Sequence, residues 1–348
     1  MKDGIVVIDK GEGVTSQRVV SSVKRIFSCK KAGHSGTLDP MATGVLPVML
    51  GRATKACEFI MDSKKHYVAV MRLCITTDTE DITGKTLSVS DKIPTQEEVI
   101  ACADGFVGEI MQTPPMYSAL KVDGRKLVDL AREGKEIDRE ARKITVYSLL
   151  CQRINDTDYS LDVVCSKGTY IRTLCADIGK ALGCGAAMAT LRRVESGGFD
   201  ISQAYSLEKL SDMSKEELDK IIIPVDKVFE KYVKVILPDF FSRLARNGLE
   251  IYQKKIGTDI PMGEMVAMYD RHGFFAVGEV REFDDGSAVK PIRLFCGEVA
   301  EYGTGSAVKP IRQDAEYGTG SAVKPIRQDA EYGTSSDSEK SKQEVSPK

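Results

Sequence analysis

The sequence predicts an α+β protein built from a larger mixed domain, residues 1–228, and a small, mostly β domain, residues 229–300. Three observations support this division. The chain has 348 residues, which is enough for one large domain and a smaller one. Apolar patterns with helix periodicity and with strand periodicity follow one another through most of the larger part. From about Lys231 the pattern changes to one short helix followed by β-type segments.

The composition indicates a globular chain whose cysteines stay reduced. Hydrophobic residues make up 42% and the formal net charge is −2, so any nucleic-acid site must be a local basic patch. The 9 cysteines are odd in number and never form a C-x-x-C pair, which argues against disulfides and against a zinc site. No apolar segment is long enough for a signal peptide or a membrane span, so we expect a cytoplasmic protein with no membrane partner.

The first elements are a strand, a turn and a helix. The apolar run Ile5–Ile8 indicates a short buried strand. The turn Gly11–Gly13 lacks the third glycine of a dinucleotide-binding fingerprint. Thr15 or Ser16 can cap the helix that follows. Its apolar positions keep helical spacing: Val19, Val20, Val23, Ile26 and Phe27.

The other face of this helix, and the turn after it, are basic. The segment from Arg18 to Lys31 has no acidic residue. Its basic members are Arg18, Lys24, Arg25, Lys30 and Lys31. Such a run of charges is usually a solvated helix face. The more specific explanation is contact with the phosphates of a nucleic acid.

The stretch Gly33–Pro40 comes next and concentrates a histidine, two hydroxyls and a carboxylate. Its glycines and its proline indicate a loop, and loops rich in reactive groups often carry function. Asp39-Pro40 could equally open a turn in which Ser35 and Thr37 cap backbone groups. These eight residues by themselves leave both interpretations open.

The following segments continue the mixed pattern. In the strand Lys65–Thr76, alternate residues form an apolar row that includes Tyr67, and a tyrosine in such a row is most often part of the core. The expected order is a strand at Val45–Leu50, a helix at Ala53–Met61, the strand Lys65–Thr76, a helix from the capping box Thr95/Glu98 to Asp104, an extended segment at Gln112–Tyr117, and paired strands at Ile144–Ile154 and Tyr159–Cys165.

A helix that Thr169 could cap and that Gly183 would end follows the paired strands. Arg172 falls in its first turn, where the helix dipole favours negative charge. This conflict predicts that Arg172 has a carboxylate or phosphate partner.

The last third of the chain contains a capped helix, the small domain and a repeat. Ser214/Glu217 form a capping box, and Ile221–Pro224 marks the end of the larger domain. The small domain should contain a helix at Phe240–Asn247 and strands at Met265–Tyr269 and Phe274–Val277. The unit Gly-Ser-Ala-Val-Lys-Pro-Ile-Arg begins at Gly286, Gly305 and Gly320. Its first copy leads into Leu294–Cys296, a possible last strand, whereas residues 301–348 are polar and predict a disordered tail.

Five spaced motifs resemble those of the TruB-type tRNA pseudouridine synthases. They are Gly33–Pro47, Lys65-x-Tyr67, Gln112–Ala119, Gly168–Arg172 and Leu191–Arg193. The resemblance covers about residues 4–300. It implies a mixed, largely antiparallel sheet flanked by helices, and a PUA-like RNA-binding module in the small domain.

The resemblance implies isomerisation of the T-arm uridine at position 55 of tRNA, with no cofactor and no metal. Asp39 would be the nucleophile, attacking either the uracil ring or ribose C1′, and Arg172 would keep its carboxylate ionised. Tyr67 would stack on the flipped base and is the candidate for taking the C5 proton. The family resemblance also suggests a monomer.

Recognition of the RNA would involve base flipping, because the target base lies inside a folded loop. His34 would brace the vacated space, although lone histidines are usually structural, and Tyr170 and Leu191 would line the pocket. Lys10 would support the site or the RNA backbone. The remaining candidates would contact phosphates: Lys30, Lys31, Arg192 and Arg193.

Three alternative functions were weighed. A serine hydrolase would need Gly-x-Ser-x-Gly, and Gly33–Gly36 has the wrong spacing. The catalytic subunit of a guide-RNA-dependent pseudouridylation particle shares the motif but usually carries extra terminal segments, so no guide RNA is expected. A non-catalytic tRNA-folding chaperone would use the same surfaces. The intact set Asp39, Tyr67 and Arg172 favours catalysis, and a chaperone role could coexist.

Overall fold

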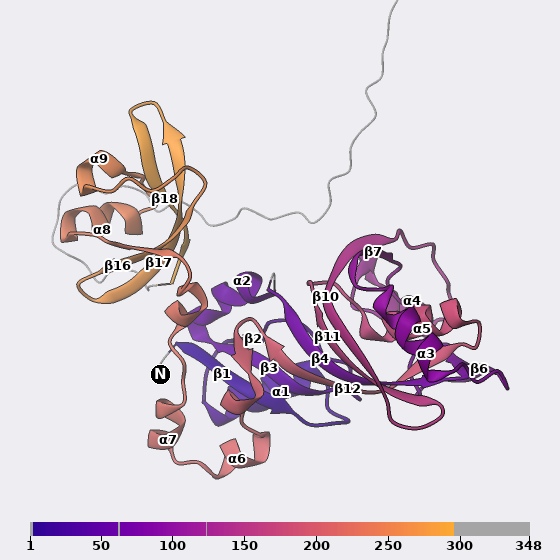
Figure 1. Ribbon diagram of the computed structural model, residues 1–348. Helices are drawn as coiled ribbons and strands as arrows, with labels where there is room; N and C mark the ends of the chain where they lie inside the picture. The colour runs from indigo at the N-terminus through magenta and orange to yellow at the C-terminus, as the bar shows by residue number, and fades with distance from the viewer. Residues whose placement is uncertain (1–2, 62, 123, 296–348) are drawn as a thin grey trace, which may run out of the picture. The chain divides into compact units, whose positions relative to one another are not determined.

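The computed structural model describes residues 3–61, 63–122 and 124–295. The predicted disordered tail, residues 301–348, lies outside this part of the chain. The described residues form a nine-stranded sheet with helices and a separate five-stranded sheet (Figure 1). The predicted α+β class with a large mixed sheet is confirmed.

The large sheet has the order β1-β3-β12-β4-β11-β10-β7, with β2 beside β3 and β13 beside β12. Every pair is antiparallel except β12 with β3. The strands are β1 (Gly4–Lys10), β2 (Ala32–His34), β3 (Thr43–Leu50), β4 (Lys65–Leu73), β7 (Gly108–Gln112), β10 (Arg142–Arg153), β11 (Asp158–Cys165), β12 (Ala186–Ser196) and β13 (Phe199–Asp200). Two small hairpins pair β5 (Ile75–Thr77) with β6 (Thr86–Val89) and β8 (Lys121–Val122) with β9 (Arg125–Lys126).

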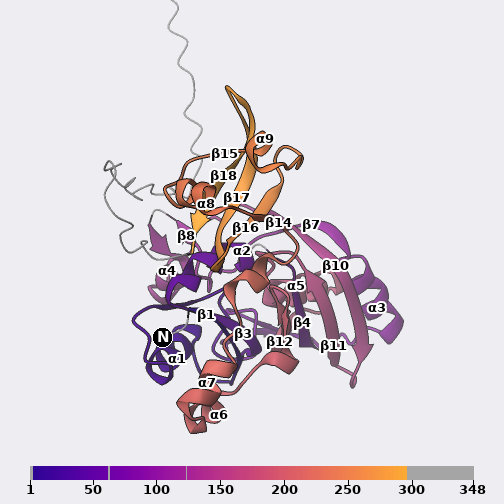
Figure 2. The same ribbon diagram turned by 90° about the vertical axis from the view of Figure 1, so that its left-hand side faces the viewer.

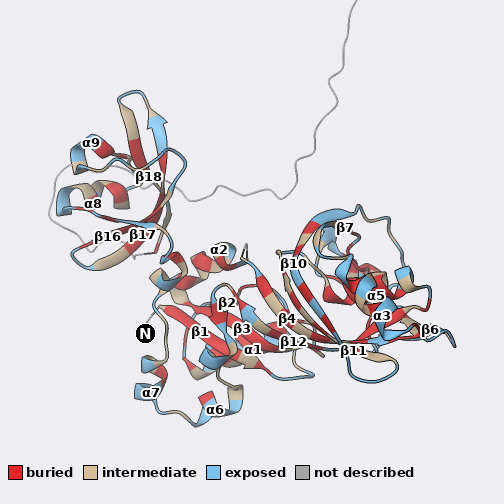
Figure 3. Ribbon diagram, in the orientation of Figure 1, coloured by how far each residue is buried: buried red, intermediate tan, exposed pale blue. Residues whose placement is uncertain are grey.

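Two groups of helices cover the larger sheet. The helix α1 (Ser16–Ile26) packs on β3, and α3 (Gln96–Asp104) and α5 (Ile171–Leu182) pack on β10 and β12 (Figure 1). Figure 3 shows β1, β3 and the facing sides of these helices as buried, whereas β6 is exposed. The other helices are α2 (Cys57–Met61), α4 (Leu127–Arg132), α6 (Leu207–Asp212) and α7 (Lys215–Lys220), with 3-10 turns at Gly51–Ala56, Ile201–Gln203 and Val225–Phe229.

Local sequence rules explain most of these elements. In β4 the odd-numbered residues are buried because only that face packs on the core, as the alternation predicts. Thr15 is the N-cap of α1, and Thr95 and Ser214 form the expected capping boxes. Gly183 ends α5 with a left-handed φ of 70°.

One expectation is wrong, and one strand was not expected. Thr169 does not cap α5, because its hydroxyl donates to the Ser166 carbonyl and Tyr170 takes the N-cap position without a side-chain cap. No strand was expected between Ala186 and Ser196, yet β12 is a central strand of the sheet.

The smaller sheet has the order β14-β16-β17-β18-β15, as expected for a mostly β segment. Its elements are β14 (Val233–Ile236), α8 (Asp239–Arg246), β15 (Ile251–Tyr252), α9 (Gln253–Ile256), β16 (Met265–Asp270), β17 (Gly273–Phe283) and β18 (Gly286–Leu294), and they are seen from a second side in Figure 2. The first copy of the repeated unit forms most of β18, which pairs with β17. None of the described helices combines the length and the apolar character needed to cross a membrane.

Candidate active site

The Asp39 loop, residues 35–42, connects β2 to β3. It leaves the large sheet where the strand beside β3 changes from β2 to β12. β2 pairs with the C-terminal end of β3, from Val48 to Leu50, and Ser35 N donates to the Pro47 carbonyl at 3.2 Å. At the other end of the same strand, Gly44 pairs with β12. The loop therefore emerges between two strands on one side of β3. The predicted loop began at Gly33, but Gly33 and His34 belong to β2 because they pair with β3.

Asp39 in the loop forms an ion pair with Arg172 in the first turn of α5. Arg172 Nε lies 2.9 Å from Asp39 Oδ2, and the arginine side chain is 5% exposed whereas the carboxylate is 35% exposed. Arg172 is the second residue of α5, and of the two partners predicted from its place against the helix dipole, a carboxylate or a phosphate, the structure shows a carboxylate. A buried cation thus orients a carboxylate that remains open to a substrate.

The guanidinium of Arg172 is held by three further groups. Its Nη1 donates to the Thr79 carbonyl at 3.0 Å and its Nη2 to the Tyr117 carbonyl at 2.8 Å. The carboxylate of Asp81 is buried, and its Oδ2 lies 4.0 Å from Arg172 Nε. Its other oxygen, Oδ1, accepts from Thr83 N at 3.0 Å. Sequence reasoning missed Asp81, although an aspartate two residues before a threonine is typical of a side chain that bonds the local backbone.

The start of α5 is fixed by Gln112. Its Oε1 accepts from Tyr170 N at 2.8 Å and its Nε2 donates to Tyr170 O at 3.1 Å, and the side chain is buried. This two-point contact replaces the missing side-chain cap and holds the backbone that carries Arg172. The role could not be read from the sequence, because Gln112 and Tyr170 are 58 residues apart.

Two side chains hold the Asp39 loop from the β1–α1 side. Lys10 Nζ donates to the carbonyls of Pro40 at 3.0 Å and of Ala42 at 2.5 Å, and Lys10 is fully buried. Burial lowers the pKa of Lys10 to about 8, against the opposing effect of the Asp39 carboxylate. Ser16, at the start of α1, bonds both backbone groups of Leu38.

Arg193 holds the loop from the other side and corrects one expectation. It is 1% exposed, and its Nε and Nη2 donate to the carbonyls of Val45 at 2.8 Å and Gly36 at 3.2 Å. A phosphate cannot reach a guanidinium buried in this way, so the expected phosphate contact of Arg193 is wrong. A Cβ on Gly44, which has a φ of 101°, would lie 2.2 Å from the Arg193 carbonyl, so glycine is required where β3 and β12 meet.

Tyr67 and Leu191 lie on neighbouring strands beside the loop. Both are buried in the hydrophobic cluster that also contains Leu38. Tyr67 on β4 stands opposite Arg193 on β12. Burial raises the pKa of Tyr67, and the positive charge of Arg193 opposes that shift. The phenol is therefore neutral in the free protein near neutral pH.

His34 ends β2 at the start of the loop. Its Nδ1 is buried and has no hydrogen-bond partner among the residues described. Burial, and then the charge of Arg193, lowers the pKa of His34, which favours the neutral imidazole. Tyr170, half-buried at the start of α5, has a pKa that burial raises.

The basic residues ahead of the loop remain on the surface. All are exposed, and none forms an ion pair within the described part of the chain: Arg18, Lys24, Arg25, Lys30 and Lys31. Arg192 differs, because its Nη2 lies 2.8 Å from Asp9 Oδ2 and its Nη1 donates to Thr43 Oγ1 at 3.3 Å. Arg192 is still 42% exposed, so part of its guanidinium faces solvent.

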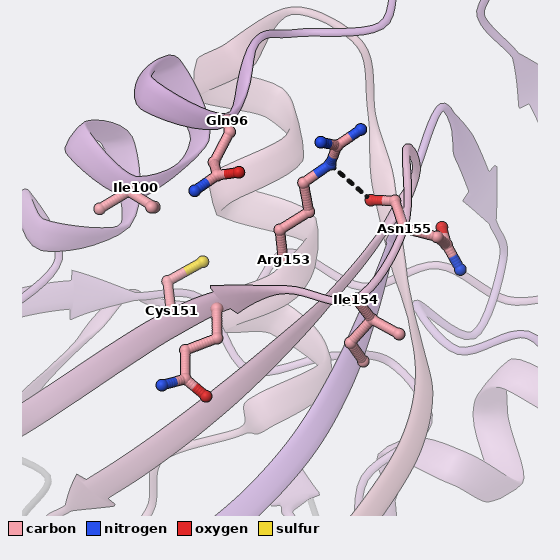
Figure 4. A pocket seen from close by; sticks show the side chains of 7 residues that line it. Gln96, Ile100, Cys151, Arg153, Ile154 and Asn155 are labelled. Atoms are coloured by element: carbon pink, nitrogen blue, oxygen red, sulfur yellow. Dashed lines mark hydrogen bonds between the residues drawn. The ribbon is translucent and has the colours of Figure 1, made fainter.

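The described residues also form a hollow away from the Asp39 loop. A surface hollow of about 640 Å³ lies between α3 and the end of β10 (Figure 4). It is lined by Gln96, Ile100, Cys151, Gln152, Arg153, Ile154 and Asn155, none of which is a predicted site residue. Across the described ranges, no three His, Cys, Asp or Glu side chains cluster in a way that could hold a metal ion.

Comparison with known proteins gives two family-model matches. Residues 24–171 match the N-terminal domain of TruB family pseudouridylate synthase, and residues 172–230 match the C-terminal domain of tRNA pseudouridylate synthase B. The border between these models falls inside α5, which the structure shows as one continuous helix.

Bacterial relatives and solved structures agree with this match. The chain is 42% identical to tRNA pseudouridine synthase B of Clostridium tetani over 80% of this chain and 95% of that protein. It is 44% identical to the protein of the same name from Clostridium acetobutylicum, over 80% and 96%. Among solved structures, a chain of a Cbf5-Nop10-Gar1 complex aligns with a TM-score of 0.66 and 31% identity, covering 84% of this chain and 85% of that one.

Proposed function

The chain belongs to the TruB family of pseudouridylate synthases, and on this premise we propose that it is a stand-alone tRNA pseudouridine synthase acting on the T-loop uridine at position 55. The contact that carries the proposal is the 2.9 Å pair between Asp39 and Arg172. A partly open carboxylate held by a buried cation is suited to nucleophilic attack inside a narrow site.

In this proposal Asp39 forms a bond either to the uracil ring or to ribose C1′, and this bond breaks again before the product leaves, which restores the carboxylate. The N1–C1′ bond breaks, the uracil turns, and a C5–C1′ bond forms, after which the C5 proton leaves and N1 gains a proton. Arg172 orients the carboxylate of Asp39 toward the substrate through the 2.9 Å contact. The balance of the reaction needs no oxidant, reductant or cofactor.

Tyr67 stacks on the flipped base and takes the C5 proton in its phenolate form. Since burial raises its pKa, the phenolate needs a nearby cation, and Arg193 on the opposite strand supplies that charge. Leu191 and Tyr170 form the walls of the pocket. The side chain of His34 is partly exposed at the start of the loop and favours the neutral imidazole, so it is suited to brace the place that the flipped base vacates.

The exposed cations ahead of the loop, with Arg192, contact the phosphates of the T arm. The cations ahead of the loop have no carboxylate partner in the described part of the chain and lie on α1 and the turn to β2, whereas Arg192 on β12 pairs with Asp9 but keeps part of its guanidinium in solvent. Lys10 is assigned to holding the loop, because it is fully buried. We further propose residues 1–228 as the catalytic domain, residues 229–300 as a PUA-like RNA-binding domain, and a cytoplasmic monomer.

The guide-RNA-dependent alternative has one supporting observation, the structural similarity to the Cbf5 chain at 31% identity. The bacterial synthases are more similar at 42–44% identity, and they favour the stand-alone enzyme. A tRNA-folding chaperone would bind the same RNA without isomerising it.

One assay tests these functions. The purified chain is incubated alone with a tRNA transcript carrying tritium at uracil C5, and release of tritium to water is followed. We expect release without a guide RNA, and Asp39→Asn should abolish it while tRNA affinity changes by less than about tenfold, or 1.4 kcal/mol. A wild-type protein that binds the transcript but releases no tritium would contradict a stand-alone synthase and support the chaperone.

A further inference from the structure

Ser16 has a hydroxyl that its own helix does not use. It is the first residue of α1, and the preceding Thr15 already provides the N-cap by accepting from Arg18 N at 3.2 Å. Ser16 is 2% exposed, so its hydroxyl is also removed from solvent. A buried hydroxyl must find a partner elsewhere, and this one finds it in the Asp39 loop.

The hydroxyl makes two hydrogen bonds to one residue of the loop. Ser16 Oγ donates to the Leu38 carbonyl at 3.0 Å and accepts from Leu38 N at 2.9 Å. The Leu38 carbonyl and Asp39 N belong to the same planar peptide group, so the first of these bonds fixes the plane on which Asp39 is mounted. Lys10 holds the Pro40 carbonyl on the other side of the nucleophile.

We infer that Ser16 is a positioning residue for the nucleophile, an inference that rests on the proposed function. With the backbone fixed at Leu38 and at Pro40, Asp39 retains mainly its side-chain rotations, and Arg172 limits those at 2.9 Å. Without the Ser16 hydroxyl, the N–H and the carbonyl of Leu38 both lose a buried partner, because Leu38 is 3% exposed. The loop shifts to satisfy them, and a shift of about 1 Å at a reacting atom can cost about a hundredfold in rate.

The test measures chemistry and binding separately in four variants of the full chain. Ser16→Ala removes the hydroxyl. Ser16→Thr and Ser16→Val form a matched pair, since they have the same shape and differ only in the hydroxyl. Ser21→Ala is the control, because Ser21 is exposed on the same helix and donates only to the Gln17 carbonyl. Each protein is assayed for single-turnover tritium release at saturating enzyme, for tRNA Kd by filter binding, and for Tm.

We expect Ser16→Ala to slow single-turnover release at least tenfold, or about 1.4 kcal/mol, with the tRNA Kd within threefold of wild type. Ser16→Thr should recover most of the rate and Ser16→Val should not, whereas Ser21→Ala should match wild type. The comparison of Ser16→Thr with Ser16→Val tests whether the hydroxyl positions the nucleophile even if the alanine variant folds poorly.

Equal rates for Ser16→Thr and Ser16→Val, or a Ser16→Ala rate within twofold of wild type, would overturn the assignment. A Kd that rises as much as the rate falls would also overturn it, because Ser16 would then act on binding. A silent wild-type protein would instead remove the proposed function, so the two failures are distinguishable.

Discussion

Replacing Arg172 with lysine keeps a positive charge beside Asp39 but removes the shape of the contact. The guanidinium reaches Asp39 Oδ2 through Nε, and the carbonyls of Thr79 and Tyr117 through its two terminal nitrogens. A lysine carries its three protons on one atom and cannot reach three acceptors spread around a plane. The substitution therefore separates the effect of charge from the effect of orientation.

The expected loss follows from these contacts. Two carbonyls lose their donors, at about 1–3 kcal/mol each, and the lower half of that range applies because Thr79 and Tyr117 are only half-buried. The free energy of unfolding should thus fall by about 2–4 kcal/mol. Loss of the charge-assisted bond to Asp39 should cost about 1.5–3 kcal/mol in the transition state, which is a rate loss of about tenfold to a hundredfold.

Urea unfolding and single-turnover tritium release measure the two losses. Arg72→Lys is the matched control, because Arg72 makes a two-point contact with Asp158, at 2.8 and 2.9 Å, on the exposed side of β4. The control should lose less than about 1 kcal/mol in unfolding and keep its full rate. If Arg172→Lys retained a rate within threefold of wild type, the geometry of the guanidinium would not matter for catalysis.

Two further predictions concern charge. Above about pH 8 the rate of the wild-type protein should fall as Lys10 loses its proton, and Lys10→Met should be slow at every pH and show no such fall. Titration of Lys10 does not itself destabilise the fold. Its pKa in the folded state, about 8, lies below its ordinary value of 10.5, so between these two values the folded state binds fewer protons than the unfolded state, and Lys10 adds stability as pH rises. The double variant Lys30→Gln/Lys31→Gln should reduce the salt slope of tRNA binding by about 1–2, since each phosphate contact contributes about 0.7–0.9.

Each of these has a contrary outcome. An alkaline fall in rate that persists in Lys10→Met would assign the titration to another group, such as Tyr67 or the substrate. An unchanged salt slope in the double variant would leave Lys30 and Lys31 as a solvated surface, which is the plainer explanation of their charge.

Much of the site could be predicted because it depends on local rules. The alternation that buries Tyr67 is a property of one strand with one covered face. The conflict between Arg172 and the dipole of its helix predicted a carboxylate or phosphate partner from one position alone. These arguments need no knowledge of which segments meet in space.

What the sequence could not reveal depends on distant contacts. β12 was missed because Arg192 and Arg193 look like surface residues, whereas Arg193 is buried and donates to the carbonyl of Val45, which lies on β3 and 148 residues earlier. Thr169 looked like a helix cap, but Gln112 from β7 takes over that end of α5. In both cases a tertiary hydrogen bond overrides the local preference of the residue.

The place of β12 in the sheet also determines when the active site can form during synthesis. It lies between β3 and β4, although β11 and α5 are made before it. Until residues 186–196 have left the ribosome, β4 has one edge without a neighbour and β3 is only partly covered, and open edges of this kind favour aggregation. Arg193 lies on β12, so its contact with the loop forms when β12 pairs with β3 and β4. The nascent chain therefore completes the surroundings of Asp39 only when β12 has joined the sheet.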